Sequence, residues 1–417
     1  MSGLDLRFRL ASAELVDLPW LLPLGEWDAT TAALRDVPVG PSRHLVRFID
    51  AGGALWALKE LPRRLAVREY DVLREMENMS LNAVRAAGLV VQPFDDTAIL
   101  VTRYLEGSWQ YRRLLMRVPT TDTAQRRRLL WAIAGLLVDL HRNGIYWGDC
   151  SLANTLFVRD GQMIQAWMVD AETAEVRPGL SDGQRNLDLD IMFENVVGGL
   201  LDVATKVDEA ADVFDQVVDE AQGIVDRYRA VWSVLHERPM IERGDRVQMA
   251  DQLRRLNDLG FAVDEVHLES AGEDGRLRLR VDVAGRRFHA EQLRSSTGLE
   301  VGQGQARILL DDLRRSGRGP RGWLDEVFRP GSRSAHQAVG HHGSAVQAYC
   351  DMVEVRTLLS EQSGQDVGDE AALQALTLRS MPADAAATLG FVDEVTQEVP
   401  VVPTDGEHPS EPRRVVD

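Results

Sequence analysis

The sequence predicts an α+β protein with two lobes, an antiparallel N-terminal sheet and a mostly helical lobe, followed by a small α/β and helical C-terminal domain. Three observations predict this class. Short β-prone runs between turn signals occupy residues 45–105. Helical spacing of apolar residues begins at residue 125, and the pattern changes again near Pro239. We therefore expect lobes over 1–107 and 108–238, a domain over 239–395 and a disordered tail over 396–417.

Composition narrows the classes of function. The net charge of −18 argues against binding nucleic acid or an anionic membrane surface, because both need a positive field. Only two cysteines occur, Cys150 and Cys350, so we expect no disulfide framework and a reducing cytoplasm. No apolar run approaches the roughly 20 residues that span a bilayer, and Met1–Leu10 lacks the features of a signal peptide. We expect a cytoplasmic protein without integral membrane contact.

The N-terminal lobe begins with a predicted β-hairpin over residues 45–61. Two apolar, β-prone runs flank the turn signal Asp50-Ala51-Gly52-Gly53. Residues 90–105 predict two more strands around a Pro-Phe-Asp-Asp turn. These segments together predict an antiparallel sheet.

The second run of the hairpin carries Lys59 near its end. A lysine that points out of a strand is ordinary by itself, and a role for it would require a carboxylate partner. The next segment has apolar residues at helical spacing over 67–76, and it offers two candidates, Glu69 and Glu75.

The most informative polar residues follow a predicted helix over 125–143, which ends at an Asn-Gly pair. Asp149 comes first, Asn154 stands five residues on, and Asp170 ends an apolar hairpin. In a phosphoryl-transfer site one aspartate meets the attacking hydroxyl, while an asparagine and a second aspartate hold Mg²⁺. An Asp–Asn pair at this spacing is common by chance, so the interpretation depends on all the elements occurring in order.

In this order the elements resemble the protein-kinase-like superfamily. The resemblance is greatest to the branch of lipopolysaccharide-core sugar kinases, aminoglycoside phosphotransferases and RIO-type kinases. Ala57-Leu58-Lys59 is similar to the family's Ala-x-Lys, and Gly148-Asp149 with Asn154 is similar to its His-Gly-Asp loop with an Asn five residues on. The resemblance implies a bilobal protein-kinase-like fold that uses ATP and Mg²⁺.

The resemblance also implies roles for single residues. It makes Asp149, Lys59 and Glu69 catalytic, and Asn154 and Asp170 metal-binding. Asp149 is expected to orient or deprotonate the acceptor, and Lys59 to contact the α- and β-phosphates. Glu69 is preferred to Glu75 because its Arg-Glu-Tyr-x-x-Leu setting is more similar to the family's helix.

Nucleotide contacts are expected in two further places. The segment equivalent to the phosphate-covering loop, Pro38–His44, has a single glycine, Gly40, with Ser42 or Arg43 as substitute donors. Adenine is expected at the hinge that follows the last strand of the sheet. The implied nucleotide-binding residues are Lys59, Gly40, Ser42, Arg103, Tyr104 and Leu105.

The chain departs from the family pattern at two positions of the catalytic region. Trp147 stands where the family often has His, and its indole offers packing and a donor in exchange. Asp170-Ala171-Glu172 replaces Asp-Phe-Gly, so we expect no activation-loop switch. Glu172 either binds a second ion or faces solvent, and we favour solvent. Further on, Asp188, rather than Asp190, resembles the buried aspartate that ties back to the catalytic loop.

The C-terminal half predicts a mixed domain. The expected helices are 247–259, 346–363 and 369–378, and the expected strands are 262–268 and 277–283. Gly302-Gln303-Gly304 lacks the third glycine and the preceding strand of a dinucleotide loop, so it predicts a packed helix instead. His336 and His341-His342 lack zinc spacing and predict a mobile linker.

This half also resembles a domain of unknown function known from actinobacteria. The stretches Leu256–Phe261 and Leu359–Gly364 carry the resemblance, which covers most of residues 210–390. No chemistry follows from it.

Three hypotheses of function result. The leading one is an ATP- and Mg²⁺-dependent phosphotransferase acting on a protein or small-molecule hydroxyl. The second is a pseudokinase scaffold that binds nucleotide and signals through its C-terminal domain, and the sparse glycine loop and Trp147 motivate it. The third is an enzyme that transfers AMP.

Overall fold

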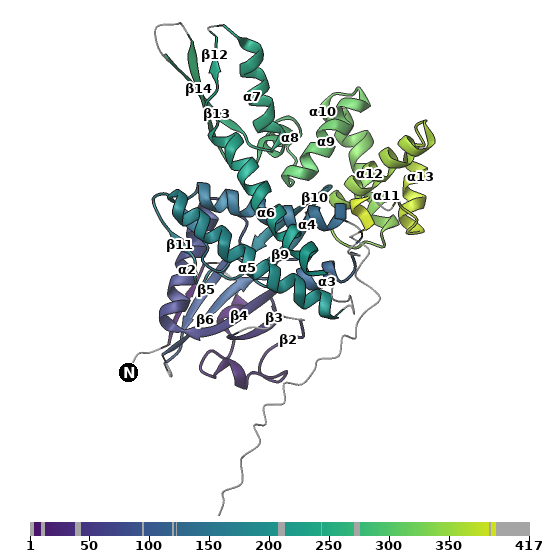
Figure 1. Cartoon of the computed structure of the whole chain (residues 1–417). Coiled ribbons are helices and arrows are strands. Elements are labelled where there is room, and N and C mark those ends of the chain that lie inside the picture. Colours follow the sequence, from purple (N-terminus) through teal and green to yellow (C-terminus); the bar gives the residue numbers. More distant parts are fainter. Residues whose placement is uncertain are drawn as a thin grey trace, which may run out of the picture.

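The structure is a computed structural model, and it confirms the predicted α+β class (Figure 1). It describes residues 4–9, 13–37, 43–93, 96–118, 121, 123–206, 213–242, 244–270, 276–382 and 385–388. Three predictions fall outside these residues: the roles of Gly40 and Ser42 and the disordered tail over 396–417.

The N-terminal lobe is a six-stranded antiparallel sheet in the order β1-β5-β6-β4-β3-β2. Its strands are β1 (Asp5–Phe8), β2 (Leu34–Arg35), β3 (Leu45–Ala51), β4 (Ala54–Pro62), β5 (Ala86–Val91) and β6 (Thr97–Arg103). Helix α2 (Arg63–Asn78) packs on one face, and short helices α1 (Ala13–Val16) and η1 (Leu24–Glu26) contribute to a separate core on the other. The predicted hairpin, the two further strands and the helix are all present.

The second lobe is mostly helical and carries short strands near the predicted catalytic loop. Its elements are β7 (Ser108–Gln110), α3 (Tyr111–Leu115), α4 (Thr123–Arg142), β8 (Ile145–Tyr146), β9 (Thr155–Asp160), β10 (Met163–Met168), β11 (Glu175–Val176), α5 (Asp182–Lys206) and α6 (Val213–His236). Strands β9 and β10 form the predicted hairpin, with every residue of Thr155–Asp160 paired. Across the described ranges, no helix combines the length and apolar character needed to cross a membrane.

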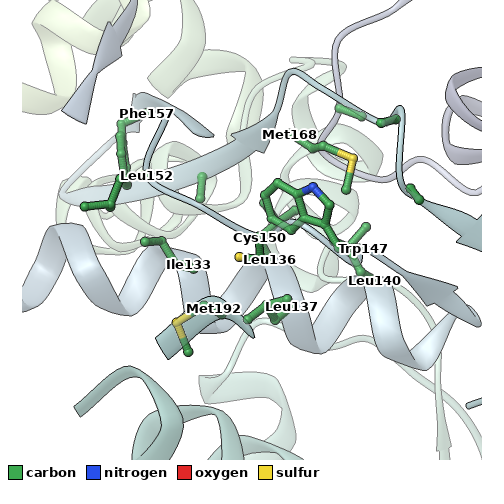
Figure 2. Close-up of a cluster of buried hydrophobic side chains, with 14 of the residues drawn as sticks. Ile133, Leu136, Leu137, Leu140, Trp147, Cys150, Leu152, Phe157, Met168 and Met192 are labelled. Atoms are coloured by element: carbon green, nitrogen blue, oxygen red, sulfur yellow. The ribbon is translucent and has the colours of Figure 1, made fainter. Parts of the chain in front are cut away.

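The core of this lobe immobilises the loop after α4 (Figure 2). Trp147 and Cys150 are fully buried and lie among α4 side chains such as Leu136, Leu137 and Leu140. Since close-packed interiors resist displacement, the backbone on either side of Asp149 is held between two buried anchors.

The C-terminal region combines a three-stranded sheet with helices. Its elements are β12 (Met240–Ile241), α7 (Arg246–Asp258), β13 (Val263–Ser270), β14 (Leu277–Val283), α8 (Phe288–Thr297), α9 (Gln303–Ser316), α10 (Pro320–Trp323), the π-helix η2 (Leu324–Phe328), α11 (Arg329–Ala338), α12 (Ala345–Ser363) and α13 (Gly368–Thr377). Leu256 and Phe261 pack into the core of the second lobe, whereas a separate core begins at Leu293. The limits of the lobes and the C-terminal domain, 1–107, 108–238 and 239–395, stay predictions.

The prediction of a mobile linker around the histidines is wrong for His336. This residue lies in the last turn of α11, whose sequence Arg-Pro-Gly-Ser reads as a loop. Pro330 continues a helical run whose preceding turn is the π-helix η2. A π-turn interrupts the regular hydrogen-bond ladder, which suits a residue that has no N–H to donate. Gly331 is required by packing, since a Cβ there would lie 2.5 Å from Cε2 of the buried Tyr349.

This contact yields a stability prediction. Gly331→Ala should lower the free energy of unfolding by about 1–3 kcal/mol, because the added methyl overpacks against a ring that cannot move away. Gly322→Ala is the control, since a Cβ at that helical glycine meets nothing within 4 Å. Thermal unfolding of the full chain measures both, and equal melting temperatures for the two variants would contradict the packing argument.

Candidate active site

Strand β4, helix α2 and the segment after β10 meet at Lys59. The Lys59 Nζ lies 3.0 Å from Glu69 Oε2 of α2 and 2.9 Å from Asp170 Oδ2, which follows β10. Glu69 is 1% exposed, and its other oxygen accepts a 3.3 Å hydrogen bond from the N–H of Ala171. Glu75 is exposed, and Glu69 is the glutamate that pairs with Lys59.

Burial and the charges of the ion-pair partners have opposite effects on the pKa values of Lys59 and Glu69. Burial alone would lower the pKa of Lys59, but the neighbouring carboxylates of Glu69 and Asp170 raise it above its ordinary value. Burial raises the pKa of Glu69 to about 7, although Lys59 and the N–H of Ala171 act against this shift. Asp170 adds to the rise through like-charge repulsion.

The loop that carries Asp149 is tied to a fully buried carboxylate. Asp188 of α5 accepts 2.8 Å hydrogen bonds from the N–H groups of Trp147 and Gly148. Its Oδ2 also lies 3.0 Å from Nε2 of His141 on α4, and Nδ1 of that ring contacts the hydroxyl of Tyr228 at 2.8 Å. The neighbouring Asp190 is exposed. Asp188 therefore fixes the turn immediately before Asp149.

Trp147 fills the place of the family's histidine without leaving a gap. Its side chain is fully buried, and its indole N–H donates to the backbone oxygen of Asp170 at 3.3 Å. The hydroxyl of Thr173 donates to the Trp147 carbonyl at 2.8 Å. These bonds join the loop that carries Asp149 to the segment that carries Asp170.

Two amide side chains orient the carboxylate of Asp149. Asn154 donates to Oδ2 at 3.1 Å and Asn195 of α5 donates to Oδ1 at 3.1 Å. Asn195 also donates to the carbonyl of Cys150 at 3.2 Å. The sequence reasoning missed Asn195, although it lies seven residues after Asp188, a spacing that places both on one face of α5.

The expectation that Glu172 faces solvent is wrong. Its side chain is 24% exposed, and Oε2 lies 2.9 Å from Nε2 of His44 and 3.8 Å from Nζ of Lys59. Glu172 thus turns towards the same cluster as Asp170. Its partner His44 precedes β3, so nothing local in the sequence announces the contact.

The oxygen donors suit a hard divalent cation. The Asn154 amide nitrogen points at Asp149, which leaves its amide oxygen for a ligand role. The segment that carries the carboxylates of Asp170 and Glu172 is bonded to Asn154 through the Val169 N–H, which donates to the Asn154 carbonyl at 3.1 Å. Carboxylate and amide oxygens are the ligands that Mg²⁺ prefers.

The expected hinge residues connect the two lobes. Arg103 is the last residue of β6, and Tyr104 and Leu105 lie between β6 and β7. The N–H of Tyr104 donates to the carbonyl of Leu55 at 2.9 Å, and its ring meets Phe48 edge-on at 5.9 Å. Adenine contact at this hinge stays a prediction.

The fold and this cluster define a kinase-like domain. Residues 54–207 match the family model of the Lipopolysaccharide kinase (Kdo/WaaP) family, and residues 230–380 match that of a Domain of unknown function (DUF4032). Among solved structures, "WaaP in complex with acyl carrier protein" is 16% identical, over 49% of this chain and 89% of that chain, with a TM-score of 0.31. No curated protein matches. One part of the chain is thus similar to the lipopolysaccharide kinase family and another to the domain of unknown function, which confirms the resemblances seen in the sequence.

The raised pKa of Glu69 predicts a pH-dependent stability difference. Between pH 4.5 and about 7 the folded protein keeps a proton on Glu69 that the unfolded chain has released, so this residue's contribution to stability is lost as pH rises. The free energy of unfolding of wild type minus that of Glu69→Gln should therefore fall across this window, by at most about 1.4 kcal/mol per unit. Unfolding curves over this pH range measure it, with the exposed Glu75→Gln as control. A difference that does not change with pH would contradict the assignment.

Proposed function

We propose that the chain is an ATP- and Mg²⁺-dependent phosphotransferase acting on a hydroxyl of a protein or small molecule. The observation that carries the proposal is the ion-pair network of Lys59 with Glu69 and Asp170, next to the Asp149–Asn154 loop. A lysine held by a buried glutamate and a metal-binding aspartate are the parts that position phosphates in kinase-like enzymes.

Each side chain has a role in this proposal. Lys59, held by Glu69, contacts the α- and β-phosphates. Asp149 accepts the hydrogen bond of the acceptor hydroxyl and takes its proton, with Asn154 and Asn195 fixing the orientation of its carboxylate. Hinge residues Arg103 to Leu105 contact adenine through their backbone.

Asn154 and Asp170 would hold the metal, and Glu172 lies close enough to the cluster to join them. When bound, Mg²⁺ neutralises phosphate charge and orients the γ-phosphate for in-line transfer. Asp170 pairs with Lys59 in the structure, so its carboxylate points into the cluster.

The decisive experiment follows transfer from ATP labelled in either the α- or the γ-phosphate. Purified protein is incubated with Mg²⁺ and separate protein and small-molecule fractions of a cell extract. Label from the γ-phosphate should reach an acceptor, and Asp149→Asn should reduce the rate by at least about 100-fold, the contribution of a general base. Transfer of α-label would instead indicate AMP transfer. No transfer of either label would favour a nucleotide-binding scaffold.

The orientation of Asp149 yields a second prediction. Asn195→Leu keeps the side-chain size but removes both donated hydrogen bonds, so kcat should fall by about ten- to a hundredfold. Asn186→Leu, at an exposed position in the first turns of α5, is the control. Steady-state ADP formation measures both, and equal rates for the two variants would show that Asn195 does not orient Asp149.

A further inference from the structure

The C-terminal region grips the hairpin that separates the two proposed metal ligands. Hairpin β9–β10 starts directly after Asn154 and ends two residues before Asp170. The N–H of Val169 donates to the carbonyl of Asn154 at 3.1 Å and closes the base of the hairpin. Its tip, at residues 160–162, lies against α9 and α12 (Figure 1).

The first grip is a helix cap supplied from the hairpin. The buried carboxylate of Asp160 accepts hydrogen bonds from the N–H of Gly304 at 2.8 Å and of Gln305 at 2.9 Å. These N–H groups belong to the first turn of α9, where they have no partner within the helix and carry the positive end of its dipole. Asp160 stands more than 140 residues away in the sequence, so the cap joins two separate parts of the chain.

Glycines make this approach sterically possible. A Cβ on Gly304 would lie 2.0 Å from the carbonyl oxygen of Asp160, and one on Gly302 would lie 2.1 Å from its Oδ1. Gly161, with a φ of +62°, would bring a Cβ within 2.9 Å of the Gly304 carbonyl oxygen. The Gly-x-Gly pair that looks like a fragment of a dinucleotide loop thus admits a carboxylate of the chain itself.

The second grip is a buried ion pair with an adjoining amide. Arg159 and Asp351 of α12 are both at least nine-tenths buried, and two guanidinium nitrogens contact the two carboxylate oxygens. Gln347, one turn earlier on α12, accepts from the Gly161 N–H at 2.9 Å and donates to the Gly161 carbonyl at 3.0 Å. Gln347 also donates to Asp351 at 2.8 Å.

The C-terminal region also holds the helix that leads into the catalytic loop. Arg142 of α4 donates to the carbonyl of Val283 at 2.8 Å. Arg286 lies 3.8 Å from Asp139 of α4, and the ring of Phe261 packs against both guanidinium groups. Contacts therefore reach α4, before Asp149, and the hairpin, after Asn154.

We propose that the C-terminal domain is a positioning element of the kinase-like site, and that Asp351 and Gln347 are positioning residues for metal binding. These two residues hold the tip of the hairpin. Its six-residue strands place the tip about 20 Å from the base, at about 3.4 Å per residue. The fully paired ladder from Asp160↔Met163 to Thr155↔Met168 carries that constraint back to Asn154 and Asp170. The proposal rests on the proposed function only in assigning metal binding to these two residues.

The test compares Asp351→Asn with a matched control that breaks a different ion pair of α12. Arg356 of α12 forms an exposed ion pair with Asp366, which Asp366→Asn disrupts without touching the hairpin. Asp351→Asn should raise the Mg²⁺ concentration needed for half-maximal nucleotide binding about tenfold, the usual scale for groups that orient metal ligands. Binding of ATP without Mg²⁺ should not change. A smaller folded fraction would lower ATP binding with and without Mg²⁺ alike, so it would not change the Mg²⁺ dependence alone.

A second readout needs no activity and no metal. Amide hydrogen exchange over residues 155–169 should accelerate about tenfold in Asp351→Asn, with β3 and β4 unchanged. Gln347→Ala removes the amide bonds of Gln347 to Gly161, Asp351 and Gln305 but keeps the Arg159–Asp351 ion pair. It should show the same effects at smaller size and serves if Asp351→Asn does not fold. Unchanged exchange in the hairpin would overturn the proposal. If wild type transfers no phosphate, exchange still decides the coupling, so the two proposals fail separately.

Discussion

Buried carboxylates hold this structure together, because each must be satisfied by donors from another part of the chain. Glu69, Asp160, Asp188 and Asp351 are all at most 5% exposed. A buried charge without partners costs several kcal/mol or more. Asp188 is met by N–H groups 40 and 41 residues away, Glu69 by one 102 residues away and Asp351 by an arginine 192 residues away. The hydrogen bonds and ion pairs that satisfy these carboxylates therefore also hold distant segments of the chain together.

Each of these four carboxylates holds an element that carries or adjoins a residue of the proposed site. Glu69 orients Lys59 in the N-terminal lobe, and Asp188 sets the loop that carries Asp149. Asp160 and Asp351 then fasten the next hairpin to α9 and α12. The C-terminal region is thus continuous with the site through polar contacts, which makes it part of the same mechanical unit.

Local patterns in the sequence predicted the elements, and non-local contacts account for what it could not predict. The β3–β4 hairpin and helix α4 follow from alternation, turn residues and apolar spacing, which depend on neighbours in the chain. Helix α11 was missed because Pro330 and Gly331 signal a loop, while its packing against Tyr349 depends on α12. The same holds for site residues: Lys59, Asp149, Asn154 and Asp170 stand out by spacing, whereas the contact of Glu172 with His44 joins residues 128 apart.

The charge balance of the cluster explains why a cation suits it. A single ammonium, that of Lys59, lies within 4 Å of carboxylate oxygens of Glu69, Asp170 and Glu172. Three carboxylates against one ammonium leave an excess of two negative charges when all are ionised, apart from any charge on His44. The raised pKa of Glu69 reflects this excess as well as burial, since Asp170 contributes to it by repulsion. A divalent cation beside Asp170 would offset that charge and allow Lys59 to turn from Asp170 towards a phosphate. The ammonium of Lys59 and a bound cation are thus two alternative ways to offset the negative charge of Asp170.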